Sequence, residues 1–183
     1  MIVPNSAEYF KEFFKSLPAT RVVKGQVLLR PGEPADKGFY VESGCLRSYI
    51  IDDKGKEHIY QFAPEDWVIT DEEAMMDHKP SILFVDAIED SVIKIMNRPV
   101  DIQSADMTLE ESRQLIQKLQ KKVYVFRRRI IQLLSANAEE RYSSFVTTYP
   151  NLVQRVPQKM IASYLGITPE SLSRVRKELV SKK

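Results

Sequence analysis

The first hundred residues alternate short apolar stretches with polar turns that contain glycine or proline. Turn sequences such as Ser43-Gly44 and Asp53-Lys54-Gly55 separate stretches that are too short for amphipathic helices. The pattern predicts eight β-strands: Arg21–Val23, Val27–Arg30, Phe39–Ser43, Leu46–Ile51, His58–Phe62, Trp67–Thr70, Ile82–Ile88 and Val92–Met96. Short strands at this spacing favour an antiparallel β-roll of the jelly-roll or cupin-like type. A short helix at about Ala7–Lys15, with Ser6 as its N-cap, is expected before them.

The stretch that follows has a different pattern, because neither glycine nor proline occurs between Pro99 and Pro150. A segment free of both helix breakers predicts helix. Within it, apolar residues repeat every seven positions, and a second set, interrupted only by Ser112, lies three residues later. We expect these residues to form the seam of a two-helix dimer: Leu109, Ile116, Leu119, Val123, Phe126, Ile130 and Leu133. The alternative is an amphipathic helix that packs against its own β-domain.

The segment Gln158–Val180 predicts two short helices joined by a tight turn. Gly166 supplies the turn, Thr168 can cap the second helix, and Pro169 suits its first position, where the missing N–H costs nothing. The apolar residues of the second helix then face inward: Leu172, Val175 and Leu179. Its opposite face carries polar residues at i, i+3, i+4 and i+7: Glu170, Ser173, Arg174 and Lys177. This pattern predicts a DNA-binding helix-turn-helix rather than an ordinary helical corner.

The net charge of +2 conceals two halves of opposite sign. Residues 1–107 contain 12 lysines and arginines against 19 aspartates and glutamates, whereas residues 108–183 contain 15 against 6. The basic half carries the predicted helix-turn-helix, so double-stranded DNA is the partner that we expect for it. The two halves could also attract each other.

Membrane and secretory features are lacking in the sequence. The longest apolar run has four residues, Ile82–Val85, far short of the roughly 20 that a membrane-spanning helix needs. The N-terminus has no basic segment followed by an apolar core, as a secretory signal would. A single cysteine, Cys45, suits a reducing compartment. We therefore expect a soluble cytoplasmic protein without membrane contacts.

A β-roll, one long helix and a C-terminal helix-turn-helix resemble the Crp/Fnr family of bacterial transcription regulators. The resemblance rests on the fragments GEPADKGFYVESGCLRSYIIDDKGKEHIYQFAPEDW and LGITPESLSRVRKEL, and it covers essentially the whole chain. It implies an α+β fold with a cyclic-nucleotide-binding-like sensory β-roll at 1–107, a dimerisation helix at 108–136 and a helix-turn-helix domain at 137–183. Glu170, Ser173 and Arg174 match the family's Glu-x-x-Ser-Arg base-reading positions, which commonly read TGA-containing half-sites of a palindrome. We expect DNA contacts from these three residues and from Thr168 and Lys177.

Two departures from the family pattern matter. Members that bind cyclic AMP carry a Gly-Glu-Leu motif followed by Arg-Ser, and the Arg-Ser pair holds the cyclic phosphate. In this sequence Pro80 replaces the arginine, and Ser81 matches the serine. Carboxylates crowd the same stretch, so we expect no cyclic-nucleotide binding and an uncharged or cationic effector, if any. The candidate effector site is Asp71, Glu72, Lys79 and Ser81. No obvious β-hairpin wing follows the second helix of the motif, so few phosphate contacts are expected.

Catalytic and metal chemistries find little support in the sequence. Cys45 alone cannot hold an iron–sulfur cluster, and His58 and His78 lack partners at metal-binding spacing. We expect no catalytic residues, no metal and no cofactor. The leading hypothesis is a homodimeric, sequence-specific DNA-binding regulator on a palindromic operator, with RNA polymerase as a further partner. The alternatives are a ligand-binding module whose basic tail makes protein contacts, and a cupin-type metalloenzyme.

Overall fold

The computed structural model describes residues 14, 16–97 and 108–181. The chain divides into two compact units, which are described separately. The first unit consists of Met1–Ile50 and Tyr60–Gln120, and the second consists of Ile51–Ile59 and Lys121–Lys183. The boundary falls inside the long helix, so the domain limits at 107/108 and 136/137 stay predictions.

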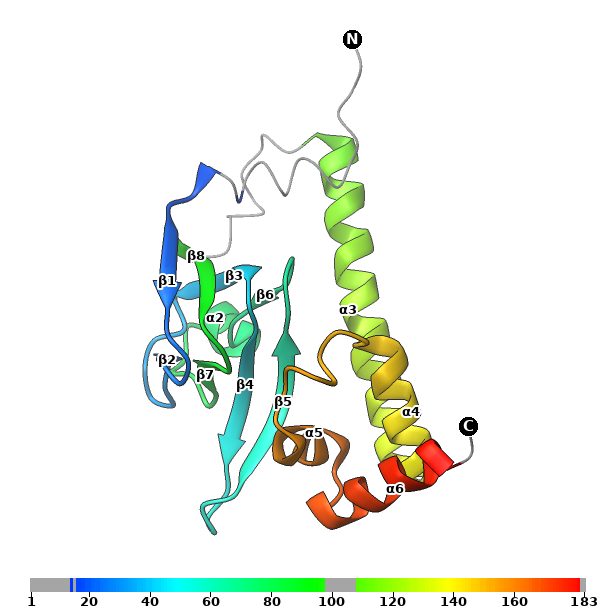
Figure 1. Cartoon of the computed structure of the whole chain (residues 1–183). Helices are drawn as coiled ribbons and strands as arrows, with labels where there is room; N and C mark the ends of the chain where they lie inside the picture. Colours follow the sequence, from blue (N-terminus) through cyan, green and yellow to red (C-terminus); the bar gives the residue numbers. More distant parts are fainter. Residues whose placement is uncertain (1–13, 15, 98–107, 182–183) are drawn as a thin grey trace. The chain divides into compact units, whose positions relative to one another are not determined.

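The first unit contains two four-stranded sheets, with strand orders β1-β8-β3-β6 and β2-β7-β4-β5 (Figure 1). Pairings β1–β8, β3–β8, β3–β6, β2–β7 and β4–β7 are antiparallel. The strands are β1 (Ala19–Val22), β2 (Val27–Leu29), β3 (Lys37–Ser43), β4 (Leu46–Ile51), β5 (Glu57–Ala63), β6 (Val68–Ile69), β7 (Phe84–Ala87) and β8 (Ser91–Asn97). Each predicted strand is present, with ends shifted by no more than two residues. The predicted antiparallel β-roll is therefore confirmed.

Side chains that alternate along the strands form the core of the β-roll. Phe39 pairs in register with Ile95, and Val41 pairs with Ile93. Val41 and Ile93 are completely buried, as is Leu46 on β4. Successive side chains of a strand point to opposite faces, so these apolar residues all line the space between the sheets.

The first unit contains one short helix that was not predicted, and only one described residue of the predicted N-terminal helix, Phe14, can be compared. A short helix, α2 (Glu72–Met76), lies where the sequence suggested only an acidic loop. The helix expected at about Ala7–Lys15 lies outside the described residues apart from Phe14, whose ring stacks on Tyr40 with centroids 4.0 Å apart.

The second unit is helical apart from the end of the β4–β5 hairpin (Figure 1). Its helices are α3 (Leu109–Ser135, which begins in the first unit), α4 (Ala138–Thr148), α5 (Gln158–Leu165) and α6 (Pro169–Ser181). Phe145, Tyr149 and Tyr164 form an aromatic cluster, with ring centroids 5.4 to 6.1 Å apart. No helix in the described part of the chain is both long enough and apolar enough to cross a membrane.

Candidate nucleic-acid interface

The turn between α5 and α6 is fixed by Gly166. Its φ of 66° and ψ of 32° lie in the left-handed region, which glycine adopts without strain. The Gly166 N–H donates to the Ser163 carbonyl at 3.1 Å, and the Ile167 N–H donates to the Ala162 carbonyl at 3.0 Å. This pair of bonds is a Schellman motif, which satisfies the last carbonyls of α5. The predicted turn is therefore present, and it sets the direction in which α6 starts.

Helix α6 begins as the sequence predicts. The Thr168 hydroxyl accepts a hydrogen bond from the Ser171 N–H at 3.2 Å, which is the N-cap arrangement. Pro169 occupies the first helical position. The Glu170 backbone N–H, followed by the Thr168 hydroxyl, holds the pKa of the Glu170 carboxyl below its usual value. Glu170 is thus an ionised hydrogen-bond acceptor at neutral pH.

One face of α6 is buried and the opposite face is exposed. Leu172 is completely buried and Val175 is 6% exposed, so they attach the helix to the rest of the second unit. The base-reading face predicted from the sequence consists of exposed residues: Glu170, Ser173, Arg174 and Lys177. Among the described residues, no carboxylate forms an ion pair with Arg174 or Lys177. Both cations remain available to an anionic partner.

A surface hollow of about 470 Å³ extends the exposed face of α6 toward the start of α5. It is lined by Gln158 from α5 and by Ser173, Arg176, Lys177 and Ser181 from α6. Arg176 is half-buried and lies to one side of the base-reading face. The hollow therefore has two cations along one wall and no carboxylate among its lining residues.

The predicted dimer seam on α3 is exposed in the single chain. Leu109 is 69% exposed, Val123 is 64% exposed and Ile130 is 58% exposed. Ile116, Leu119 and Leu133 are also exposed, and Phe126 is half-buried. Apolar side chains next to the seam add to this surface: Tyr124, Ile131 and Leu134. An apolar stripe this long is unusual on the surface of a monomer.

The four candidate effector residues do not all lie together. Asp71 and Ser81 are buried and in contact: the Ser81 hydroxyl donates to the Asp71 carboxylate at 2.9 Å. The N–H groups of Ala74 and Ile82 each donate to the same carboxylate at 3.1 Å. Lys79 is exposed and forms an ion pair with Asp77 at 2.6 Å, and Glu72 is half-buried in the first turn of α2.

Two polar side chains that the sequence analysis did not single out lie inside the β-roll. Ser48 pairs in register with the core residue Val85, and Gln61 lies two residues before the core residue Ala63 on β5. Both side chains therefore face the interior. The Ser48 hydroxyl and both amide atoms of Gln61 have no hydrogen-bond partner among the described residues. A polar residue at an inward position of an apolar strand is the only sequence signal that could have found them.

Residues 19–100 match the family of the cyclic nucleotide-binding domain. Over 171 residues the chain is 32% identical to the anaerobic regulatory protein of Pasteurella multocida, covering 84% of this chain and 60% of that protein. The chain spans 60 to 63% of the length of the first curated relatives that it matches.

Solved structures share the fold. FixK2 from Bradyrhizobium japonicum superimposes with a TM-score of 0.75 at 20% identity, over 91% of this chain and 85% of that one. A transcriptional regulator of the CRP/FNR family from Thermus thermophilus superimposes with a TM-score of 0.69 at 20% identity. The match covers 90% of this chain and 87% of that one. The class is thus a cyclic nucleotide-binding β-roll followed by a helical C-terminal part. The resemblance to the Crp/Fnr-type transcription regulators that the sequence predicted is confirmed by these similarities, and the relatives that the chain matches are regulators.

Proposed function

We propose that the chain acts as a homodimeric, sequence-specific DNA-binding regulator. The observation that carries this proposal is the exposed face of α6, whose direction is set by the Gly166 turn and the Thr168 cap. A helix that enters the major groove presents its N-terminal turns to the base edges. Glu170, Ser173 and Arg174 lie in those turns.

The chemistry of these side chains fits base reading. The Arg174 guanidinium can donate two hydrogen bonds to O6 and N7 of one guanine. The ionised Glu170 carboxylate can accept a hydrogen bond from N4 of cytosine. Lys177 lies one turn further along α6 and suits a phosphate, and Thr168 suits a contact at the start of the helix. The five residues thus divide into base-reading and positioning groups.

The α3 seam supports a dimer with two-fold symmetry. Leu119, Val123 and Ile130 on one copy would pack against the same residues of a second copy, which removes exposed apolar surface from water. Two α6 helices related by two-fold symmetry read a palindrome whose half-sites are about 10–11 base pairs apart, centre to centre. A palindromic operator follows from the symmetry of the dimer.

The β-roll is proposed to sense a small effector other than cyclic AMP. The donors of Ser81 and Ile82 already bind the Asp71 carboxylate, which would repel a cyclic phosphate at the same place. Ser48 and Gln61 instead offer an uncharged hydroxyl and amide inside the β-roll. These groups suit a neutral polar molecule, because burying them without partners costs free energy.

The proposal also includes RNA polymerase as a partner and a cytoplasmic location. A regulator bound at a promoter can contact RNA polymerase, and both operator and polymerase place the protein in the cytoplasm. The alternative, a basic tail used only for protein contacts, accounts for the charge of the second half but not for the spacing of Glu170, Ser173 and Arg174.

Binding-site selection from random duplexes tests the proposed function. We expect enrichment of a two-fold palindrome with the half-site spacing given above. Selected duplexes that carry a single half-site would contradict the dimer. No enriched duplex, together with capture of a protein by the basic half, would favour the alternative.

A further inference from the structure

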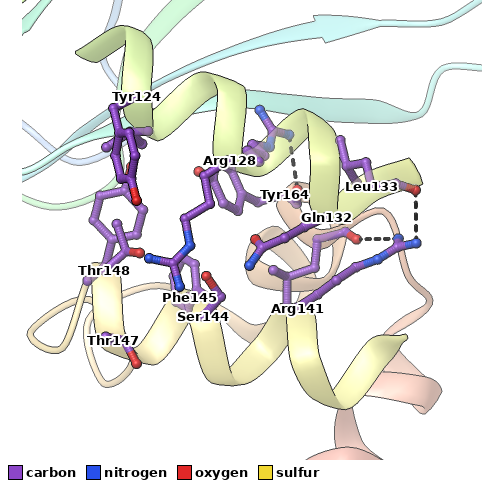
Figure 2. A pocket seen from close by; sticks show the side chains of 14 residues that line it. Tyr124, Arg128, Gln132, Leu133, Arg141, Ser144, Phe145, Thr147, Thr148 and Tyr164 are labelled. Atoms are coloured by element: carbon purple, nitrogen blue, oxygen red, sulfur yellow. Dashed lines mark hydrogen bonds between the residues drawn. The ribbon is translucent and has the colours of Figure 1, made fainter. Parts of the chain in front are cut away.

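A cleft of about 240 Å³ lies between α3 and α4 in the second unit (Figure 2). Its floor contains the buried aromatic cluster of Phe145, Tyr149 and Tyr164. Hydroxyl groups from both helices line its edges: Tyr124 from α3, and Ser144, Thr147 and Thr148 from α4. The cleft is separate from α6 and from the β-roll, so neither proposed site accounts for it.

Most of the α3 residues that line the cleft lie away from the dimer seam, and Leu133 is the seam residue that also lines it. With Val123 at heptad position a, Arg128 occupies position f, and Val125 and Gln132 occupy position c. Positions c and f point away from a and d, so a two-helix seam would leave them uncovered. The part of the cleft around Arg128 would therefore remain open in a dimer.

The charge of the cleft is positive. The lining residues, all within the described part of the chain, include Arg128, Arg129 and Arg141 and no aspartate or glutamate. Among the described residues, Arg141 donates to the backbone carbonyls of Ala136, Leu133 and Leu165 at 3.0 to 3.1 Å and to no carboxylate. Its guanidinium is held in place while its charge is not neutralised by a carboxylate.

Arg128 differs from the other two arginines. Arg129 donates to the carbonyls of Ile59 and Tyr164, which fixes its side chain. Arg128 has no ion pair or hydrogen bond with any described residue, and Figure 2 shows its side chain reaching from α3 toward Ser144 and Thr148 of α4. A guanidinium beside an apolar floor is suited to bind a carboxylate through two parallel hydrogen bonds.

We propose that this cleft binds a small monocarboxylate with an aromatic or branched aliphatic body. The carboxylate contacts Arg128 and the neighbouring hydroxyls, and the body packs on Phe145 and Tyr149. A single unengaged guanidinium matches the single negative charge of a carboxylate, whereas a phosphate carries more charge than Arg128 alone would balance. The cleft is smaller than the roughly 300–1,000 Å³ of drug-sized sites, so the ligand must be small.

Calorimetry on the full chain, without DNA, tests the proposal with four carboxylate probes: acetate, isovalerate, benzoate and phenylacetate. We expect isovalerate, benzoate and phenylacetate to bind saturably with a Kd below about 10 mM. Benzyl alcohol, which lacks the carboxylate, should bind at least about tenfold more weakly than benzoate. Arg128→Gln should weaken benzoate at least tenfold, whereas Arg127→Gln, which removes the same charge from an exposed position outside the cleft, should not. Ser144→Leu narrows the cleft without changing charge and should also abolish binding.

Four results would overturn the proposal. The first is that none of the four probes binds saturably, and the second is that the Arg128→Gln and parent proteins bind benzoate with equal affinity. The third is that Arg127→Gln weakens benzoate binding as much as Arg128→Gln does. The fourth is that inorganic phosphate displaces benzoate at a concentration below that of the benzoate. Because DNA is absent, failure here leaves the proposed operator binding untouched.

Discussion

Neighbouring side chains on α6 are expected to contribute differently to DNA binding. Lys177 is exposed, lies beyond the first turns of α6 and suits a phosphate. Lys177→Ala should weaken all duplexes alike and reduce the slope of log affinity against log salt by about one unit, because one phosphate contact is lost. Fluorescence titrations at several salt concentrations measure both effects. A change in base preference would show instead that Lys177 reads a base.

The environment of Asp71 leads to a second prediction at this scale. Its carboxylate already accepts hydrogen bonds from Ser81 and from the Ile82 N–H, and Pro80 offers no cation. Cyclic AMP and cyclic GMP should therefore have no meaningful affinity for the chain. Calorimetry with each nucleotide is the test, and a micromolar Kd for either one would disprove the expectation.

Single residues were predictable from the sequence where their role is local. The Thr168 cap, the Gly166 turn and the exposed positions of Glu170 and Arg174 all follow from spacing within one segment. Asp71 was predicted as a candidate effector residue, but its hydrogen bond with Ser81, ten residues away, was not predicted, because this contact joins separate elements. Periodicity carries no information about such contacts.

At the scale of elements, the exposed seam of α3 supports a dimer. Val123→Asp would place two carboxylates in the apolar interface and should dissociate the dimer at micromolar concentration. Sedimentation of the parent and variant measures this change. Lys121→Asp, on the exposed side of α3 away from the seam, is the matched control and should remain dimeric. A monomeric parent would refute the dimer.

The turn before α6 gives a prediction about stability. Gly166 and Gly55 (φ +74°) both have a left-handed backbone, which strains any residue with a Cβ. A Cβ at Gly166 would also lie 3.0 Å from a Leu133 methyl carbon, whereas a Cβ at Gly55 would have no atom within 4 Å. Gly55→Ala should cost about 1 kcal/mol and Gly166→Ala roughly 2 kcal/mol in unfolding free energy. Urea unfolding followed by helix circular dichroism compares them. Equal losses would mean that Leu133 moves away without cost.

The elements differ in how much the sequence reveals of them. Strands β1 to β8 follow from turn residues and short apolar stretches, and α3 from the absence of glycine and proline. Helix α2 was missed because five residues are too few to show a helical period. The start of α4 carried a usable signal: Asn137 and Glu140 form a capping box.

At the scale of the whole molecule, the end of the β4–β5 hairpin belongs to the second compact unit, although the rest of both strands belongs to the first. This end is anchored by Ser163, whose hydroxyl accepts from the Ile59 N–H at 3.0 Å and donates to the Glu57 carbonyl at 2.9 Å. Arg129 donates to the Ile59 carbonyl at 2.8 Å. These contacts join residues 70 to 106 positions apart, so no local pattern in the sequence predicts them.

In the proposed dimer, two-fold symmetry would make each base contact count twice on a palindromic operator. Arg174→Ala should remove one guanine contact from each half-site, at a cost of about 1–3 kcal/mol per half-site. Arg176→Ala is the matched control, because it removes the same charge from the same helix beside the base-reading face.

Binding-site selection with the parent, Arg174→Ala and Arg176→Ala proteins tests base reading by α6 most directly. The parent and Arg176→Ala should select the same palindrome, and Arg174→Ala should lose preference at one position of each half-site. Identical motifs for all three would contradict the central claim, because Arg174 would then read no base and α6 would not be the recognition helix.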